Sequence, residues 1–369
     1  MVRLRAYLIF IVVVLLVCGS FLSAGLADGG GNHQTRNMHF GVSGGNVNDI
    51  TRRFCCSGTL GSLVTDGSTQ YILSNNHVLA RSDQANAGED VSQPGLIDNN
   101  CNVATVVADF SIASPLGSNV DAALAQLRPG TMDSTGFIED IGVPSSTTIT
   151  PAVGLAVAKS GRTTGFTTGT IGSVNTSVSV QYQRNCGSGK KFVVSYTNQV
   201  VINSSTFSAG GDSGSLIVSN NAAHNPVALL YAGSSSTTIG NPIDEVLSKL
   251  AIVLGGPLSF VGTGGGGGGA LPTGARDGVE PYIPNLGGQM RQLPQQAAAR
   301  ASGVLETHRA NLMSVPGVIG AGVGASADND VEAAIIVYVD RTSAARPQFA
   351  ASLDGVAIRV IFTDPFVAF

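Results

Sequence analysis

The sequence predicts a mainly β protein that ends in a smaller α+β region. Between about residues 54 and 240, short apolar runs such as QYILSNN, VATVVADFSIAS and SGSLIVS alternate with turn residues. The chain contains no Trp, only 12% charged residues and 48 glycines, a composition that suits short strands and turns better than helices. Strands this short and this frequent are typical of a β-barrel or a β-sandwich.

The boundaries between the predicted elements follow from turn and linker signals. The dipeptide Asp-Gly at 66–67 separates two apolar runs and predicts a β-hairpin. NPIDEVLSKLAIVL at 241–254 has apolar residues at helical spacing, so we expect a helix to end the β region there. GTGGGGGGALPTGARDG predicts a flexible linker, which we place within 255–293. Beyond it we expect a domain of unknown role over 294–369 with a helix over 294–315, two strands within 316–340, a short helix within 346–355 and a last strand over 356–364.

Residues 1–27 are predicted to be a secretory signal peptide. Two arginines precede the apolar run LIFIVVVLLV, and small residues lead to a cleavage site after Ala27. The alternatives are a retained membrane anchor, for which the apolar run is short, and a lipoprotein site at Cys18. We therefore expect a secreted, periplasmic or cell-envelope protein with no stable membrane insertion after cleavage. Residues 28–53 are expected to form an N-terminal arm or a short propeptide.

Four cysteines remain after the predicted signal peptide: Cys55, Cys56, Cys101 and Cys186. An even number of cysteines in an exported chain favours disulfide bonds. A bond between the neighbours Cys55 and Cys56 is sterically poor, so we expect each of them to reach one of the other two. A zinc site is the alternative, but no histidine stands at a ligand-like spacing from these cysteines. Neither a metal nor an organic cofactor is predicted.

Three residues in the predicted β region can together form a nucleophile and its base. A serine hydroxyl is a weak nucleophile at neutral pH, so it needs a general base, a group that orients the base, and donors for the oxyanion. Ser213 lies between glycines in SAGGDSGSL, His77 directly follows QYILSNN, and Asp121 opens the apolar run DAALAQL. Taken singly, His77 can be a core histidine and Asp121 a helix N-cap. The order His, Asp, Ser is one of the orders found for catalytic triads.

With this order in place, the chain resembles the trypsin-like (chymotrypsin-fold) serine proteases, in particular their bacterial members. The resemblance includes AKSGRTTGFTTGTI at 158–171, GGDSG at 210–214 and ALLYAGSSS at 228–236, which is followed by NPI and the predicted helix. It covers about residues 54–254. It implies a double six-stranded antiparallel β-barrel with a C-terminal helix. It also implies that Ser213 attacks the substrate, His77 is the base, Asp121 orients it, and the backbone N–H groups of Gly211 and Ser213 form the oxyanion hole.

The chain departs from the family pattern at several positions. Val78 stands where the family often has Cys, and Asn75 and Asn76 replace smaller residues before the histidine. Ser215 replaces a second glycine after the nucleophile. A disulfide common in bacterial members is missing at both of its ends, which correspond to Ala158 and Thr168.

The predicted function is that of a serine endopeptidase whose partner is a peptide or protein substrate. The resemblance places the primary specificity pocket at Phe207, Tyr231 and Gly233, where no Asp is present, so an uncharged residue is expected before the cut bond. The formal net charge of −4 gives no basic footprint for nucleic acid. The alternatives are a catalytically silent protein of the same fold that binds peptides, and an esterase or amidase that uses the same triad.

Overall fold

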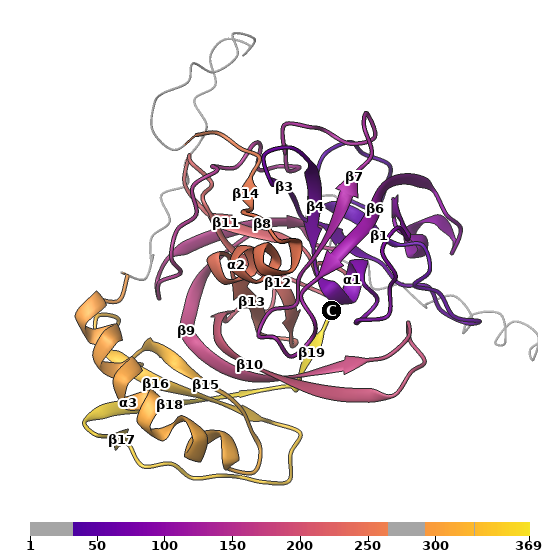
Figure 1. Ribbon diagram of the computed structural model, residues 1–369. Coiled ribbons are helices and arrows are strands. Elements are labelled where there is room, and N and C mark those ends of the chain that lie inside the picture. Colours follow the sequence, from indigo (N-terminus) through magenta and orange to yellow (C-terminus); the bar gives the residue numbers. More distant parts are fainter. Residues whose placement is uncertain (1–31, 265–291, 328) are drawn as a thin grey trace, which may run out of the picture. The chain divides into compact units, whose positions relative to one another are not determined.

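The computed structural model describes residues 32–264 and 292–369 except residue 328 (Figure 1). The predicted signal peptide and most of the predicted linker lie outside the described residues. Most of the described elements are strands that form two curled sheets, so the mainly β prediction is confirmed.

The first sheet runs in the order β14-β3-β4-β7-β6-β5-β1-β2. Strand β2 at one end of this order and β3, next to β14 at the other end, are separated in the chain by Gly61 alone. They act as one bent strand, so the sheet closes into a six-stranded barrel with β14 added at the side. The expected hairpin at 66–67 joins β3 to β4. The strands are β1 (Val42–Asn46), β2 (Gly58–Leu60), β3 (Ser62–Thr65), β4 (Gln70–Ser74), β5 (Asp90–Gln93), β6 (Thr105–Ala113), β7 (Ala123–Leu127) and β14 (Ser259–Phe260).

The second sheet contains another six-stranded ring, in the order β10-β13-β12-β11-β8-β9, which closes because β10 also pairs with β9. The double barrel is thus present as predicted. β12 is buried along its whole length and lies between β13 and β11 in the ring. The strands are β8 (Ala156–Gly161), β9 (Gly165–Gln183), β10 (Lys191–Ile202), β11 (Leu216–Ser219), β12 (Pro226–Gly233) and β13 (Thr238–Pro242).

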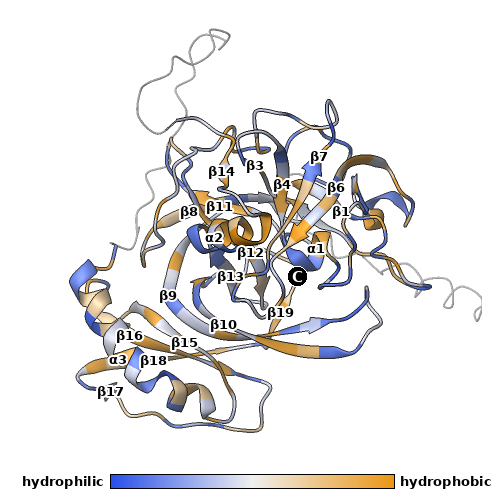
Figure 2. Ribbon diagram, viewed as in Figure 1, coloured by the Kyte–Doolittle hydropathy of each residue, from blue (hydrophilic) through white to orange (hydrophobic). Residues whose placement is uncertain are grey.

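Short helices accompany the barrels. The single turn α1 (Asn76–Leu79) follows β4, and a 3-10 turn covers Leu96–Asn99. The predicted helix after the second barrel is α2 (Ile243–Leu254), which ends at Gly255 in the left-handed conformation. Its apolar side chains Ile243, Val246 and Leu250 are buried in an apolar cluster to which both barrels contribute, and the helix packs on β12 and β13 as well as on β6. Figure 2 shows this helix largely apolar.

The C-terminal module, residues 292–369, continues the sheet of the second barrel. β15 pairs with β9, and the order then runs β16-β18-β17, while the helix α3 packs on β15 and β16. The predicted helix and strands are present, but the predicted short helix within 346–355 is wrong, because this stretch has no regular structure up to the two-residue strand β17 and then turns. The elements are α3 (Gln295–Ser314), β15 (Val318–Ala325), β16 (Ala333–Asp340), β17 (Ser352–Leu353), β18 (Val356–Thr363) and β19 (Phe366–Ala368).

Two segments that were predicted to lie outside the β region contain strands. β1 lies within the segment 28–53, where an arm or propeptide is predicted, and pairs with β2 and β5. β14 lies within the predicted linker and pairs with β3. Both segments therefore contribute strands to the first barrel, while the division of the chain into domains stays a prediction.

Candidate active site

His77 lies where the first barrel faces the second. β4 ends at Ser74, and the single turn α1 carries the imidazole out of the sheet. His77 Nδ1 lies 2.6 Å from Asp121 Oδ2, and the backbone N–H of His77 donates to Asp121 Oδ1 at 3.1 Å. Burial by itself lowers the pKa of His77, but the charge of Asp121 and its hydrogen bond outweigh burial, so the pKa is raised above its ordinary value.

The carboxylate of Asp121 is fully buried and held from several sides. It precedes β7, so the strand interpretation of DAALAQL holds and the helix N-cap interpretation does not. Asn75 Nδ2 donates to the carbonyl of Asp121 at 2.7 Å, and the N–H of Asp121 donates to Asn241 Oδ1 at 2.9 Å. The departure at Asn75 thus has a structural use, since this side chain fixes the backbone of Asp121.

A tyrosine that sequence reasoning missed also binds this carboxylate. Tyr182 on β9 donates its hydroxyl to Asp121 Oδ2 at 2.8 Å and shares a 2.7 Å hydrogen bond with the hydroxyl of Tyr196 on β10. Tyr182 is buried, and its ring stands edge-on to His77 with 6.0 Å between the ring centroids. Asp121 Oδ2 therefore accepts hydrogen bonds from two partners at once.

Ser213 lies in a tight turn between the two barrels. Gly211 and Gly214 flank it with φ of +98° and +95°, values that favour glycine. Thr59 on β2 donates its N–H to the carbonyl of Ser213 at 2.8 Å. A Cβ on Gly61 would lie 1.8 Å from the carbonyl oxygen of Gly214, so glycine is required where the bend between β2 and β3 meets this turn. The turn is thereby fixed to the first barrel.

The carboxylate just before Ser213 is held by a buried lysine. Asp212 Oδ2 lies 3.4 Å from Lys159 Nζ, and both side chains are fully buried. Asp212 Oδ1 accepts the N–H of Thr163 at 2.8 Å, and Oδ2 accepts the hydroxyl of Thr164 at 2.7 Å and the N–H of Ala209 at 3.0 Å. This network joins the SGRTTG segment to the turn that carries Ser213. Lys159 is another residue whose role the sequence did not reveal.

The remaining departures from the family pattern fit their surroundings. Asn76 is buried and donates to Asp83 Oδ1 at 2.6 Å and to the carbonyl of Ser114 at 2.8 Å. Ser215 donates its hydroxyl to the carbonyl of Asp212 at 2.7 Å, in space left open by Gly161, where a Cβ would lie 2.4 Å from Ser215 Oγ. Ala158 and Thr168 lie opposite each other in the β8–β9 pair. Val78 is buried.

The last residues of the chain run into the cleft beside His77. β19 pairs antiparallel with β12, with Ala368 opposite Ala232 and Val367 opposite Gly233. His77 Nε2 lies 3.0 Å from the backbone oxygen of Phe369, while Ser213 Oγ donates to the carbonyl of Tyr231 at 3.1 Å. Figure 1 shows β19 ending beside α1, the helix of His77.

The structure brings the predicted pocket residues together around this chain end. The N–H of Phe369 donates to the carbonyl of Tyr231 at 3.3 Å, and the ring packs against the apolar cluster that contains Phe207. A Cβ on Gly233 would lie 2.5 Å from Cζ of Phe369. Gly211 lines the same cleft, which has a volume of about 310 Å³.

A second carboxylate lines this cleft on the side of α1. Burial raises the pKa of Asp49 to about 6, although the charges of His77 and Arg81 pull it down. The cleft therefore has charged groups, Asp49 and Arg81, beside His77.

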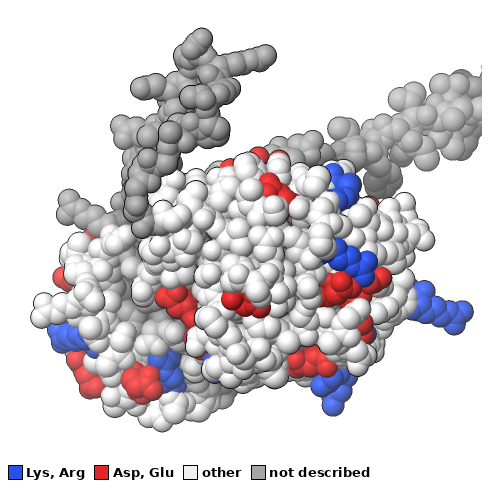
Figure 3. Space-filling model, turned by 45° about the horizontal axis from the view of Figure 1, so that its top comes forward, with Lys and Arg blue, Asp and Glu red and all other residues white. Residues whose placement is uncertain are grey.

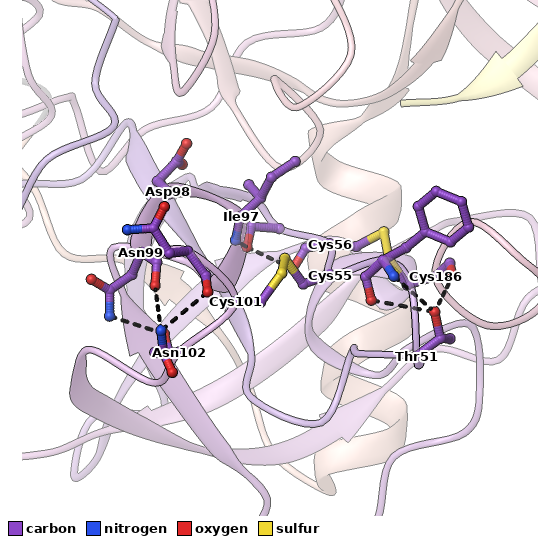
Figure 4. Close-up of a disulfide and its surroundings, with 12 residues drawn as sticks. Thr51, Cys55, Cys56, Ile97, Asp98, Asn99, Cys101, Asn102 and Cys186 are labelled. Carbon is purple, nitrogen blue, oxygen red and sulfur yellow. Dashed lines mark hydrogen bonds between the residues drawn. A yellow bond between two sulfur atoms is a disulfide. The ribbon is translucent and has the colours of Figure 1, made fainter.

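Two disulfides fix the rim of the cleft. Cys55 is bonded to Cys101 and Cys56 to Cys186, each with 5.6 Å between the Cα atoms (Figure 4). The neighbouring cysteines thus reach different partners. Cys56 and Cys186 line the cleft, so the second bond ties the β9–β10 hairpin to the first barrel beside His77.

Figure 3 shows acidic and basic side chains scattered in small mixed groups on the face it presents. Among the described residues no group of three or more His, Cys, Asp or Glu side chains can hold a metal ion. Within the same ranges no helix is both long and apolar enough to cross a bilayer.

Residues 71–253 match the model of peptidase family S64, a span that begins in β4 and ends in α2. Solved structures resemble the chain at low identity. A glutamic acid specific serine protease shares 22% identity over 60% of this chain and 98% of its own, with a TM-score of 0.42. Thermobifida fusca protease A shares 18% over 61% of this chain and 98% of its own, with a TM-score of 0.40. The Cellulomonas bogoriensis chymotrypsin shares 18% over 61% and 99%, also with a TM-score of 0.40.

No curated protein sequence matches the chain. The two six-stranded barrels, with the Ser213 turn between them, agree with the match to a peptidase family, which begins in β4 of the first barrel and includes the whole second barrel. Together, the architecture and this match identify the chain as a chymotrypsin-fold serine peptidase.

Proposed function

We propose that the protein is a serine endopeptidase in which Ser213 attacks a peptide carbonyl, His77 is the general base and Asp121 orients the base. One observation carries this proposal above all. A peptide segment, the chain's own end, lies along β12 with its backbone oxygen 3.0 Å from Nε2 of a histidine whose Nδ1 faces a buried carboxylate. A cleft that accepts extended backbone by strand pairing suits a peptide substrate better than a simple ester.

The mechanism follows from the hydrogen bonds around these groups. With the cleft free, the hydroxyl of Ser213 turns from the carbonyl of Tyr231 to Nε2 of His77 and gives up its proton as Oγ bonds to the substrate carbonyl carbon. The backbone N–H groups of Gly211 and Ser213 stabilise the oxyanion. His77 then gives the proton to the leaving amine, and a water molecule, deprotonated by His77, releases the acyl group from Ser213.

The same cleft supports a preference for an uncharged residue before the cut bond. Its pocket is formed by Phe207, Tyr231 and Gly233, and the apolar ring of Phe369 packs there. A charged side chain would lose its hydration against these groups. The two disulfides further support the proposal that the protein works in an oxidising compartment outside the cytoplasm.

An aryl fluorophosphonate tests the nucleophile directly, because Ser213 Oγ would displace fluoride and form a stable bond to phosphorus. We expect labelling in the wild-type chain or in a Phe369→Asp chain, in which the cleft is opened. Ser213→Ala is expected to abolish both the labelling and the hydrolysis of casein.

Ser208→Ala is the matched control for this test. Ser208 lies in the same stretch, but its hydroxyl bonds to Thr238, so labelling is expected to persist. The proposed mechanism is wrong if the Ser213→Ala chain is labelled as strongly as its parent. It is also wrong if neither parent, the wild-type chain or the Phe369→Asp chain, is labelled. Labelling with ester cleavage but no casein cleavage would favour an esterase.

Tyr182→Phe is expected to lower kcat/KM by about tenfold, because a hydrogen bond to a charged group contributes about 1.5–3 kcal/mol. Tyr182 acts through Asp121 as a positioning residue. Without its hydroxyl, Asp121 attracts the imidazolium more strongly, so the pKa of His77 rises and the acid limb of the pH–rate profile moves to higher pH.

Tyr338→Phe serves as the control for this variant. Tyr338 is also a buried tyrosine, and its hydroxyl bonds to Ser173 Oγ at 2.9 Å inside the contact between β16 and β9. Its loss is expected to affect stability but not the acid limb. A Tyr182→Phe chain with the parent's profile and kcat/KM would show that Tyr182 has only a structural role.

A further inference from the structure

We propose that the tail segment, residues 366–369, is a tethered peptide that occupies the acyl-side subsites of the cleft and holds the peptidase inactive. This inference rests on the proposed function. It assigns a role to the C-terminal module, and it names the ligand class of the cleft as extended apolar peptides that end in an aromatic residue.

The backbone of the tail is bound as a peptide strand. β19 lies between β12, with which it pairs antiparallel, and β9, with which it pairs in parallel through Phe366 opposite Val180 and Val367 opposite Gln181. The N–H of Phe369 adds a 3.3 Å bond to the carbonyl of Tyr231. Strand addition of this kind gives affinity through main-chain hydrogen bonds and leaves specificity to pockets for alternate side chains.

The side chains of the tail fit those pockets. The ring of Phe369 lies where any side chain on Gly233 would overlap it, and it contacts the apolar cluster around Phe207. Phe366 is 1% exposed and lies in the apolar cluster that contains Val180 of β9 and Tyr231 of β12, where it also packs against Tyr338 of its own module, with 5.8 Å between the ring centroids. Both aromatic residues of the tail are therefore used in its recognition.

The tail also separates the nucleophile from its base. Nε2 of His77 faces the backbone oxygen of Phe369, and the hydroxyl of Ser213 is turned to the carbonyl of Tyr231. The backbone oxygen of Phe369 can only accept a hydrogen bond, so Nε2 must carry a proton while the tail is bound. His77 then cannot take the proton of Ser213, and a substrate cannot enter the same subsites.

The C-terminal module holds the tail at this place. Thr363, the last residue of β18, is buried and bonds to Ser234 Oγ at 2.6 Å and to Thr237 Oγ1 at 3.2 Å, in the loop after β12. Asp364 accepts the hydroxyl of Ser235 at 2.5 Å, and Arg341 pairs with Asp364. The tail thus leaves the module directly beside the cleft. A short tether of this kind gives an effective concentration on the order of millimolar.

The test compares two substitutions of the same kind. Phe369→Asp places a carboxylate against the apolar pocket, so the tail should dissociate and casein hydrolysis should rise by about tenfold or more over the wild-type chain. Phe362→Asp is the control, because Phe362 lies on β18 of the same module and is 53% exposed. Its activity is expected to equal that of the wild type, and circular dichroism checks that both variants are folded.

Peptide binding provides an independent measurement. A labelled peptide with the sequence of residues 361–369, IFTDPFVAF, should bind the Phe369→Asp chain and inhibit it in competition with substrate. The peptide with Asp at its last position should do neither. On substrate panels, the Phe369→Asp chain should cut after Phe in preference to Lys or Asp.

The outcomes separate this inference from the proposed function. If the wild-type and Phe369→Asp chains both cleave casein and do so at equal rates, the inference is overturned while the proposed function stands. Absence of peptide binding would overturn it as well. If no chain reacts with the fluorophosphonate or cleaves casein but the peptide binds with the expected preference, the proposed function fails and the assignment of the subsites stands.

Discussion

Replacing Asp121 by Asn is expected to lower kcat by about 10⁴-fold while the protein stays folded. Both oxygens of Asp121 face hydrogen-bond donors, Oδ1 the N–H of His77 and Oδ2 both His77 Nδ1 and the hydroxyl of Tyr182. An amide group in either orientation turns its NH₂ towards a donor. The backbone N–H of His77 cannot turn away, so the NH₂ takes the Oδ2 position; the imidazole then takes the tautomer in which Nδ1 accepts and Nε2 carries the proton, and Nε2 cannot receive the proton of Ser213.

The pH dependence gives this prediction a second readout. Burial lowers the pKa of His77, and the charge and hydrogen bond of Asp121 reverse that effect and raise it. Neutral His77 is the active form, so the parent's rate should rise with pH along a limb above the ordinary value of about 6.5. Without the carboxylate, burial dominates and the limb should move to lower pH, opposite to the shift expected for Tyr182→Phe.

Asp109→Asn is the matched control for this substitution. This substitution also removes a carboxylate, but Asp109 pairs with Arg128, and both side chains are about two-fifths exposed. Kinetics should be measured in the wild-type chain and in the Phe369→Asp chain, each against its own parent. If Asp121→Asn lowers kcat no more than Asp109→Asn does, Asp121 is not part of the proposed triad.

Local patterns along the chain predicted most strands but not their remote contacts. The order His, Asp, Ser and the GGDSG turn led to His77 and Ser213 because each follows or precedes a recognisable apolar run. Tyr182 lies in a run with alternating polar residues, SVSVQYQ, where its inward position resembles that of any core tyrosine. Its hydroxyl meets Asp121 only when β9 closes over the first barrel, and no local pattern encodes that contact.

The failed helix within 346–355 has a related cause. Phe349 and Leu353 are four residues apart and both pack against the core of the module, which imitates helical spacing. The turn of Asp354 and Gly355, with φ of +45° and +74°, is the stronger signal. It joins β17 to β18 as a two-residue hairpin, with Leu353 opposite Val356.

Replacing Lys159 by Met is expected to lower the free energy of unfolding by about 3–5 kcal/mol, because it leaves the buried carboxylate of Asp212 without its cation. Lysine is rarely found fully buried, so no local pattern around Lys159 predicted this pair. Burial lowers the pKa of Lys159, and Asp212 offsets that effect. Lys159 also donates to the carbonyl of Gly165 at 2.9 Å and bonds to Thr164, so its loss also loosens the segment that holds the Ser213 turn.

Thermal and urea unfolding of single and double variants measure this effect. Lys159→Met combined with Asp212→Asn removes both charges and should recover a large part of the lost stability, since a buried pair is costly to break but less costly to replace as a whole. Lys191→Met, at an exposed position on β10, should change the stability by no more than about 0.5 kcal/mol. A Lys159→Met chain as stable as the Lys191→Met control would mean that hydrogen bonds from Thr163, Thr164 and Ala209 are enough to hold the carboxylate beside Ser213.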